Sequence, residues 1–216
     1  MGDQLVLKSE FEAKILEHAG AGRSEELEEV KIVLRGAKRK LRESGKEDKG
    51  GGKKPLLIGD LLAILDTMGD GAKDVRDKAL LLVGWSAALR RSEITSLDVC
   101  DIQDDPRGIL LRLGGKGHCV PVRRRDKYCP VASLRSWLDL VGNPTNGPVF
   151  RTINNGHITD RRMDGRDVAR LIQSHVARIG IDSRGYAGHS LRSGLVVSAG
   201  AGDPWQEDPA GKAGLR

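Results

Sequence analysis

Residues 188–194 read Gly188-His189-Ser190-Leu191-Arg192-Ser193-Gly194, and the interpretation of the whole chain starts from this heptapeptide. As a helix, it places His189 and Arg192 three residues apart on one face, so an imidazole and a guanidinium can converge on one anion. The pair therefore suggests a site for a phosphate group. The same spacing is also common on solvated helix faces. The other segments of the chain must therefore decide between a phosphate site and a solvated helix face.

The composition predicts a basic globular protein. The 216 residues are 38% hydrophobic and 31% charged, which allows one sizeable core. A net charge of +6 and a pI near 9.3 favour a polyanionic partner, and nucleic acid is the commonest one. No apolar run is long enough for a membrane span, and the first residues lack a secretory pattern. We expect a cytoplasmic protein with no membrane partner.

The cysteines predict neither a disulfide framework nor a zinc site. Their number is odd and no Cys-x-x-Cys pair occurs, so we expect buried or idle thiols at Cys100, Cys119 and Cys129. No other residues have metal-ligand spacing, and no metal site is predicted.

Charge changes sign near the start of the chain. Residues 1–30 carry three basic and eight acidic side chains, whereas residues 31–54 carry ten basic and three acidic ones. A helix ending near residue 42 exposes basic side chains that either contact DNA or are simply solvated: Lys38, Arg39, Lys40 and Arg42. Residues 43–54 contain no large apolar side chain and predict a linker.

Beyond the linker, the pattern predicts a mainly α-helical fold with a small antiparallel β-sheet. We expect Asp60 to cap a short helix, and helices over 74–88, from Cys129 or Pro130 to about 140, and over 164–179. The last of these is amphipathic, and its inward-facing residues are Val168, Leu171, Ile172, His175 and Val176. We expect His175 in a packing or surface position, not as a ligand. Residues 109–113 and 118–122 predict a β-hairpin with Lys116 in its glycine-rich turn. Three arginines extend the positive surface after the second strand: Arg123, Arg124 and Arg125.

Two adjacent arginines, Arg90 and Arg91, follow the apolar helix of residues 74–88. Both cannot be buried, and Glu93 lies three residues after Arg90, close enough to hold its guanidinium. By itself, this arrangement is equally consistent with a surface ion pair.

Together, three pieces resemble a known family. They are Ala-Leu-Arg-Arg-Ser-Glu-Ile at 88–94, the glycine-flanked Lys116, and the heptapeptide at 188–194, and in this order they resemble the catalytic domain of tyrosine site-specific recombinases, the phage-integrase family. The resemblance implies the catalytic-core fold of DNA breaking-rejoining enzymes. It divides the chain into an N-terminal helical remnant of a core-binding domain (1–42), a linker (43–54), an integrase-like catalytic domain (55–198) and an irregular tail (199–216).

The resemblance also implies roles for five residues. Arg90 and Arg192 would clamp the non-bridging oxygens of a phosphodiester, and Glu93 would orient Arg90. Lys116 would protonate the leaving 5′ oxygen, and His189 would position or deprotonate the attacking hydroxyl or hydrogen-bond a non-bridging oxygen. The implied partners are double-stranded DNA and other recombinase protomers on it, without a metal or another cofactor.

The chain departs from the family after the heptapeptide. The family places a histidine or tryptophan and then a nucleophilic tyrosine well downstream, but the 24 residues after Arg192 contain no Tyr and no His. Tyr128 and Tyr186 both precede His189. We therefore expect a truncated or frame-disrupted integrase with crippled strand cleavage. The alternatives are a non-catalytic DNA-binding remnant and a product that folds poorly.

Overall fold

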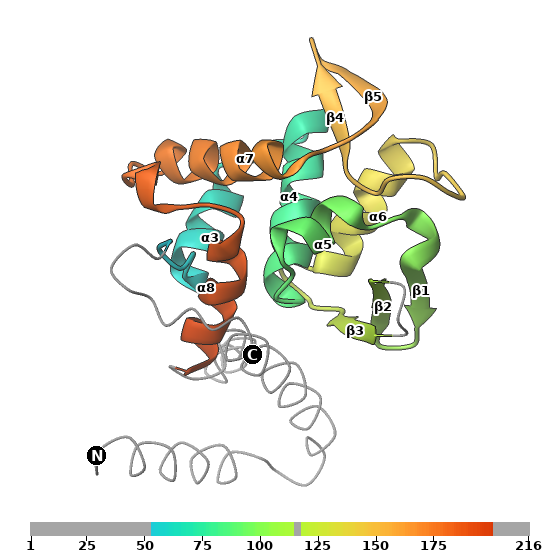
Figure 1. Ribbon diagram of the computed structural model, residues 1–216, viewed down its shortest axis with the longest axis horizontal. Helices are drawn as coiled ribbons and strands as arrows, with labels where there is room; N and C mark the ends of the chain where they lie inside the picture. Colours follow the sequence, from blue (N-terminus) through green and yellow to red (C-terminus); the bar gives the residue numbers. More distant parts are fainter. Residues whose placement is uncertain (1–52, 115–117, 201–216) are drawn as a thin grey trace, which may run out of the picture. The chain divides into compact units, whose positions relative to one another are not determined.

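The computed structural model describes residues 53–114 and 118–200 (Figure 1). The chain divides into two compact units, Met1–Gly45 and Lys46–Arg216, and all described residues belong to the second. The predicted basic helix end, most of the linker, Lys116 and residues 201–216 lie outside the described residues. The elements are α3 (Ile58–Asp66), α4 (Ala72–Ser86), α5 (Arg91–Ser96), η1 (Val99–Asp101), β1 (Ile102–Asp105), β2 (Gly108–Leu113), β3 (His118–Arg123), α6 (Pro130–Leu140), β4 (Arg151–Asn154), β5 (His157–Arg162), α7 (Gly165–Arg178), η2 (Ser183–Gly185) and α8 (His189–Gly200).

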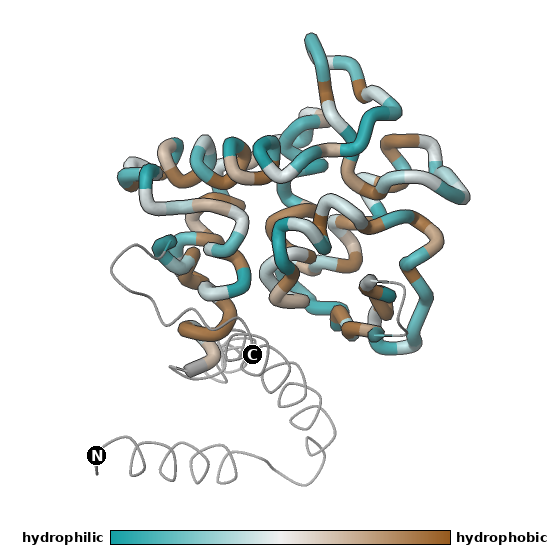
Figure 2. Tube along the Cα trace, in the orientation of Figure 1, coloured by the Kyte–Doolittle hydropathy of each residue, from teal (hydrophilic) through white to brown (hydrophobic). Residues whose placement is uncertain are grey.

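Helix α4 forms the centre of this unit. Its second half is apolar on all sides, and a helix of that kind must be enclosed by other elements. Helices α6 and α8 pack against it (Figure 1). In Figure 2 the hydrophobic stretches fall mainly on the helices, whereas the β4–β5 hairpin is largely hydrophilic. The fully buried hydrophobic residues of α4 are Ala79, Leu80, Leu81, Leu82, Val83 and Trp85.

The first sheet has three antiparallel strands in the order β1-β2-β3. Leu111 on β2 is opposite Ile102 on β1 and Val120 on β3, and alternate residues of β2 are buried, so one face of the sheet covers the core. The predicted hairpin of 109–122 is therefore confirmed. The sequence pattern does not predict strand β1, because Ile102 is its only apolar residue and no alternation marks it.

The start of α3 corrects one prediction. Asp60 does not cap this helix, because α3 begins at Ile58 and Asp60 lies within its first turn. The N–H of Ile58 instead donates to Ser198 Oγ at 3.2 Å, so a side chain on α8 provides the cap. Helix α8 itself extends to Gly200, two residues past the predicted boundary of the tail.

Helix α7 confirms the predicted amphipathic segment. Its N-cap is Asp164, whose carboxylate accepts the N–H groups of Arg166 and Asp167 at 2.6 and 2.9 Å. These backbone hydrogen bonds lower the pKa of the Asp164 carboxyl. The residues predicted to face inward are all buried: Val168, Leu171, Ile172, His175 and Val176.

We expect Trp137→Phe to lower the free energy of unfolding by about 2 kcal/mol. Trp137 on α6 is fully buried, and its Nε1–H donates to the carbonyl oxygen of Val149 at 2.7 Å. Phenylalanine leaves that buried carbonyl without its donor and a small cavity beside it. Urea unfolding followed by circular dichroism measures the change. A decrease below about 0.5 kcal/mol would contradict the importance of this bond.

Candidate functional site

Arg90 lies at the junction between α4 and α5. Helix α4 ends with a hydrogen bond from Leu89 N–H to Gly84 O at 2.9 Å, and Ala88 takes a left-handed conformation with φ of +49°. This turn places Arg90 at the N-cap of α5. Glu93 accepts the backbone N–H of Arg90 at 2.7 Å, and its other oxygen lies 3.8 Å from Arg90 Nη1. Glu93 therefore binds the backbone of Arg90, which the sequence did not indicate, and lies within ion-pair distance of its guanidinium.

Arg192 lies in the first turn of α8 and is 6% exposed. Its Nη1 donates to the carbonyl oxygen of Ala88 at 3.4 Å, which brings it to the turn that presents Arg90. Burial lowers the pKa of Arg192, the charge of Arg90 lowers it further, and Glu93 acts in the opposite direction. The structure thus brings together two guanidiniums and one carboxylate, with a net charge of +1. This is an arrangement that an anion such as a phosphodiester would stabilise.

Helix α8 is anchored by contacts that the sequence did not reveal. The Leu56 N–H donates to the carbonyl oxygen of Ser190 at 2.8 Å, and Ser190 Oγ accepts the N–H of Ala187 at 3.0 Å. The Leu56 backbone also crosses Gly194 so closely that a Cβ there would lie 1.9 Å from the Leu56 oxygen. Gly194 therefore permits the close approach that fixes α8, and through it Arg192.

Arg91 also contributes to the geometry of the site. A Cβ on Gly188 would lie 2.7 Å from the Cβ of Arg91, and one on Gly165 would lie 2.8 Å from its Nε. The side chain of Arg91 therefore passes against both glycines and brings α5 close to α7 and to the start of α8. No role for Arg91 follows from the sequence, since nothing local indicates which glycines it meets.

The remaining residues with predicted catalytic roles are His189 and Lys116. His189 is the exposed first residue of α8, one turn before Arg192, and its carbonyl oxygen accepts a hydrogen bond from Ser193 Oγ at 3.0 Å. Lys116 lies between β2 and β3, outside the described residues, and its predicted position relative to the arginines stays a prediction.

The predicted basic residues after the hairpin lie at the end of β3 opposite to the Lys116 turn. Arg123 is the last residue of β3, and the strand separates it from His118, its first residue, by about 17 Å. It forms an ion pair with Asp105 at 3.5 Å. The Arg124 side chain is exposed, and Arg125 donates its backbone N–H to Cys129 Sγ at 3.4 Å. The three arginines therefore lie at and just after the end of the second strand, and their predicted contact with DNA stays a prediction.

Of the two states expected for the cysteines, buried or idle thiols, the structure excludes burial for two of the three. Cys100 and Cys119 are free and exposed, not buried, and Cys129 is half-buried at the N-cap of α6, where its Sγ accepts the N–H of Ala132. Within residues 53–114 and 118–200, no three His, Cys, Asp or Glu side chains are grouped to hold a metal ion. None of the helices described there is long and apolar enough to cross a membrane.

The architecture, mainly helical with a small antiparallel sheet between the two arginine motifs, is that of the catalytic core of DNA breaking-rejoining enzymes. Residues 57–197 match the sequence profile described as the phage integrase family, and the chain belongs to that family.

Relatives and one solved structure agree with this family. The chain is 31% identical over 163 residues to an integrase/recombinase XerD homolog of Selenomonas ruminantium, covering 70% of this chain and 48% of the homolog. It is 39% identical over 155 residues to the tyrosine recombinase XerD of Mycobacterium leprae, covering 67% of this chain and 47% of that recombinase. A structure of the XerH site-specific recombinase bound to a palindromic difH substrate shares the fold, with a TM-score of 0.55 and 14% sequence identity. The match covers 71% of this chain and 44% of the XerH chain. The chain thus spans about half the length of the curated relatives that it matches.

Proposed function

We propose that this chain binds double-stranded DNA and that Arg90 and Arg192 hold the non-bridging oxygens of one phosphodiester. The observation that carries the proposal is the convergence of the two arginines from α5 and α8, where burial and the charge of Arg90 both lower the pKa of Arg192. A phosphate between them would offset this repulsion and accept hydrogen bonds from both guanidiniums. The family, and the DNA substrate of the structurally similar XerH complex, support DNA as the ligand.

In the reaction proposed for this site, a hydroxyl oxygen attacks the phosphorus and the bond to the 5′ oxygen breaks. The two arginines bind the charge that grows on the non-bridging oxygens, and Glu93 keeps Arg90 in place. His189 accepts or directs the proton of the attacking hydroxyl, and Lys116 gives a proton to the leaving oxygen. No metal or other cofactor takes part in this scheme.

Neither of the two tyrosines upstream of His189 takes the place in the chain that the family gives its nucleophile. The Tyr128 hydroxyl donates a hydrogen bond to the Asp66 carboxylate. Tyr186 is 5% exposed, and burial raises the pKa of its hydroxyl, with a smaller contribution from Asp60. We infer that the 216-residue polypeptide binds and polarises a DNA phosphodiester without cleaving it, unless another protomer supplies the nucleophile. A non-catalytic DNA-binding protein is therefore the second candidate function.

The test is duplex binding by the purified 216-residue chain. We expect affinity to fall steeply with salt, and Arg90→Ala to weaken binding about 10-fold, because alanine cannot donate charged hydrogen bonds to the phosphate. Arg184→Ala is the matched control, because Arg184 is an exposed arginine paired with Asp182 at 2.9 Å. Fluorescence anisotropy with a labelled duplex measures both variants. Equal affinities for Arg90→Ala and the control would contradict the phosphate clamp.

A second assay separates the two candidate functions. The chain is incubated with a duplex that it binds, and covalent protein-DNA adducts are separated on a denaturing gel. We expect no adduct. An adduct that survives denaturation would favour the recombinase activity and overturn the non-catalytic function.

A further inference from the structure

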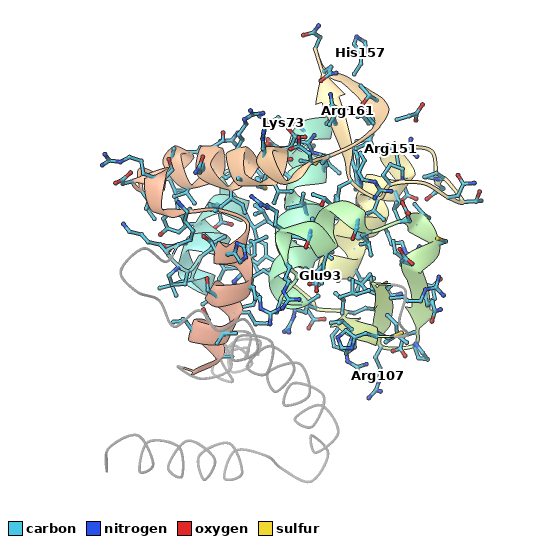
Figure 3. The ribbon with its side chains drawn as sticks, viewed as in Figure 1. Lys73, Glu93, Arg107, Arg151, His157 and Arg161 are labelled. Atoms are coloured by element: carbon cyan, nitrogen blue, oxygen red, sulfur yellow. The ribbon has the colours of Figure 1, made fainter. Side chains whose placement is uncertain are left out.

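A hollow at the other end of α4 is not used by the proposed clamp. It has a volume of about 400 Å³ and lies between the first turns of α4, the β4–β5 hairpin and one face of α7. Lys73, near the start of α4, and Arg161, on β5, both line it and are labelled in Figure 3. Since Arg90 follows the opposite end of α4, the helix separates the two places by about 20 Å.

The wall of the hollow includes a buried arginine held in a fixed orientation. Arg76 is 6% exposed, and its Nε and Nη2 donate to one oxygen of Asp77 at 2.9 and 2.7 Å. The other oxygen of Asp77 lies 2.9 Å from Nε2 of His175, and both of these side chains are buried. Arg76 Nη1 donates to the carbonyl oxygen of Arg151 at 3.2 Å. The ion pair of Arg76 and Asp77 thus gives the hollow a rigid polar wall, and the two charges of this pair offset each other.

The rim of the hollow carries an excess of positive charge. Arg170 is 3.7 Å from Asp167, so these two charges also offset each other. Lys73 and Arg161 are exposed, and neither forms an ion pair within the described residues, although the field of Arg161 helps to lower the pKa of Asp164. Two of the four cations lining the hollow are therefore left uncompensated, and Thr152 and Ser174 line the same space.

We propose that this hollow is a second binding site, for a phosphate group, separate from the clamp formed by Arg90 and Arg192. Two uncompensated cations lining one hollow with a fixed guanidinium match the charge and the acceptor oxygens of phosphate. The phosphate belongs either to the backbone of a bound DNA or to a free phosphate or phosphorylated small molecule. The proposal does not depend on the chemistry at the first site.

The variant that tests the site is the double substitution Lys73→Ala/Arg161→Ala. Replacing Arg76 would remove one of the two partners of the buried Asp77 carboxylate and endanger folding, so the two exposed rim residues are changed instead. The control is Lys127→Ala/Arg184→Ala, which removes the same charge from two exposed residues that do not line the hollow. Equal unfolding midpoints show that both proteins are folded.

Two measurements distinguish the sources of the phosphate. In the first, inorganic phosphate is titrated into the wild-type protein, and we expect backbone amide NMR signals of Lys73, Thr152 and Arg161 to shift saturably. In the second, duplex affinity is measured against salt. If the DNA backbone is the source, the slope of log K against log salt becomes shallower in the rim variant, by about 0.9 for each DNA phosphate that the rim no longer neutralises.

Each outcome decides the proposal. A smaller salt slope for the rim variant than for its control supports the site and assigns it to the DNA backbone. Phosphate-induced shifts with equal salt slopes support the site and assign it to free phosphate or a small phosphorylated molecule. The absence of both effects would overturn the second site and leave the clamp at Arg90 untouched.

Discussion

Gly194→Ala is expected to lower the free energy of unfolding by about 3 kcal/mol, because a side chain there has no space. A Cβ on Gly194 would lie 1.9 Å from the backbone oxygen of Leu56, 2.7 Å from its carbonyl carbon and 2.9 Å from Nε1 of Trp85. Two of these atoms belong to the backbone and cannot rotate away. The same Leu56 oxygen accepts the Trp85 Nε1–H at 3.0 Å, so moving Leu56 also strains a buried hydrogen bond.

Gly59→Ala is the matched control for this substitution. Gly59 is an exposed residue inside α3, and a Cβ there would meet nothing within 4 Å. Alanine should therefore raise the free energy of unfolding by about 0.5–1 kcal/mol, because it loses less backbone entropy than glycine. Urea unfolding of both variants measures the difference. A difference between the two variants below about 0.5 kcal/mol would contradict the close crossing of Leu56 and α8.

The consequence of Gly194→Ala should extend to DNA binding. Arg192 lies on the same helix, two residues before Gly194, and Leu56 also holds that helix through its hydrogen bond to Ser190. If the Leu56 backbone and α8 separate, Arg192 moves relative to Arg90. We therefore expect weaker duplex binding even under conditions where the variant remains folded.

The periodic elements were predictable because their signals are local. The five inward-facing residues of α7 repeat at helical spacing, and the hairpin strands alternate around a glycine-rich turn, so each pattern can be read within a dozen residues. The contact of Glu93 with Arg90 is local too, since the two residues are neighbours on one helical turn. By contrast, the convergence of Arg90 with Arg192 was expected only from the family resemblance.

The features that the sequence does not reveal all depend on distant segments. The requirement for glycine at 194 arises from Leu56, and the requirement at 188 arises from Arg91. The helical pattern predicts a packing or surface position for His175, and it is buried, but its Nε2 also meets the carboxylate of Asp77 on α4. No spacing rule connects such partners, because tertiary folding alone brings them together.

The buried arginine of the clamp is electrostatically unfavourable in the free protein. Arg192 is removed from water and lies in the field of Arg90, and both effects disfavour its charge. Arginine nevertheless stays protonated at any accessible pH, so its own titration adds no pH dependence to the stability of the folded state. A residue that weakens the free protein and strengthens an anion complex is typical of binding sites selected for function over stability.

Arg192→Met should therefore change stability and binding in opposite directions. Methionine keeps an unbranched apolar stem and removes the charge, so the free energy of unfolding should stay equal or increase, with no dependence on pH between about 5 and 9. Duplex affinity should fall about 10- to 100-fold, since methionine donates no charged hydrogen bonds to phosphate. Urea unfolding and anisotropy with a labelled duplex, in the same buffer, measure the two quantities.

Two further variants make the Arg192 prediction specific. Arg192→Lys keeps the charge without the planar fork, so its duplex affinity should lie between those of the wild type and Arg192→Met. Arg184→Met changes an exposed arginine that is paired with Asp182, and it should leave both stability and affinity near the wild-type values. If Arg192→Met were instead less stable and kept its affinity, Arg192 would be a structural residue that ties α8 to Ala88, and the phosphate clamp would have to be abandoned.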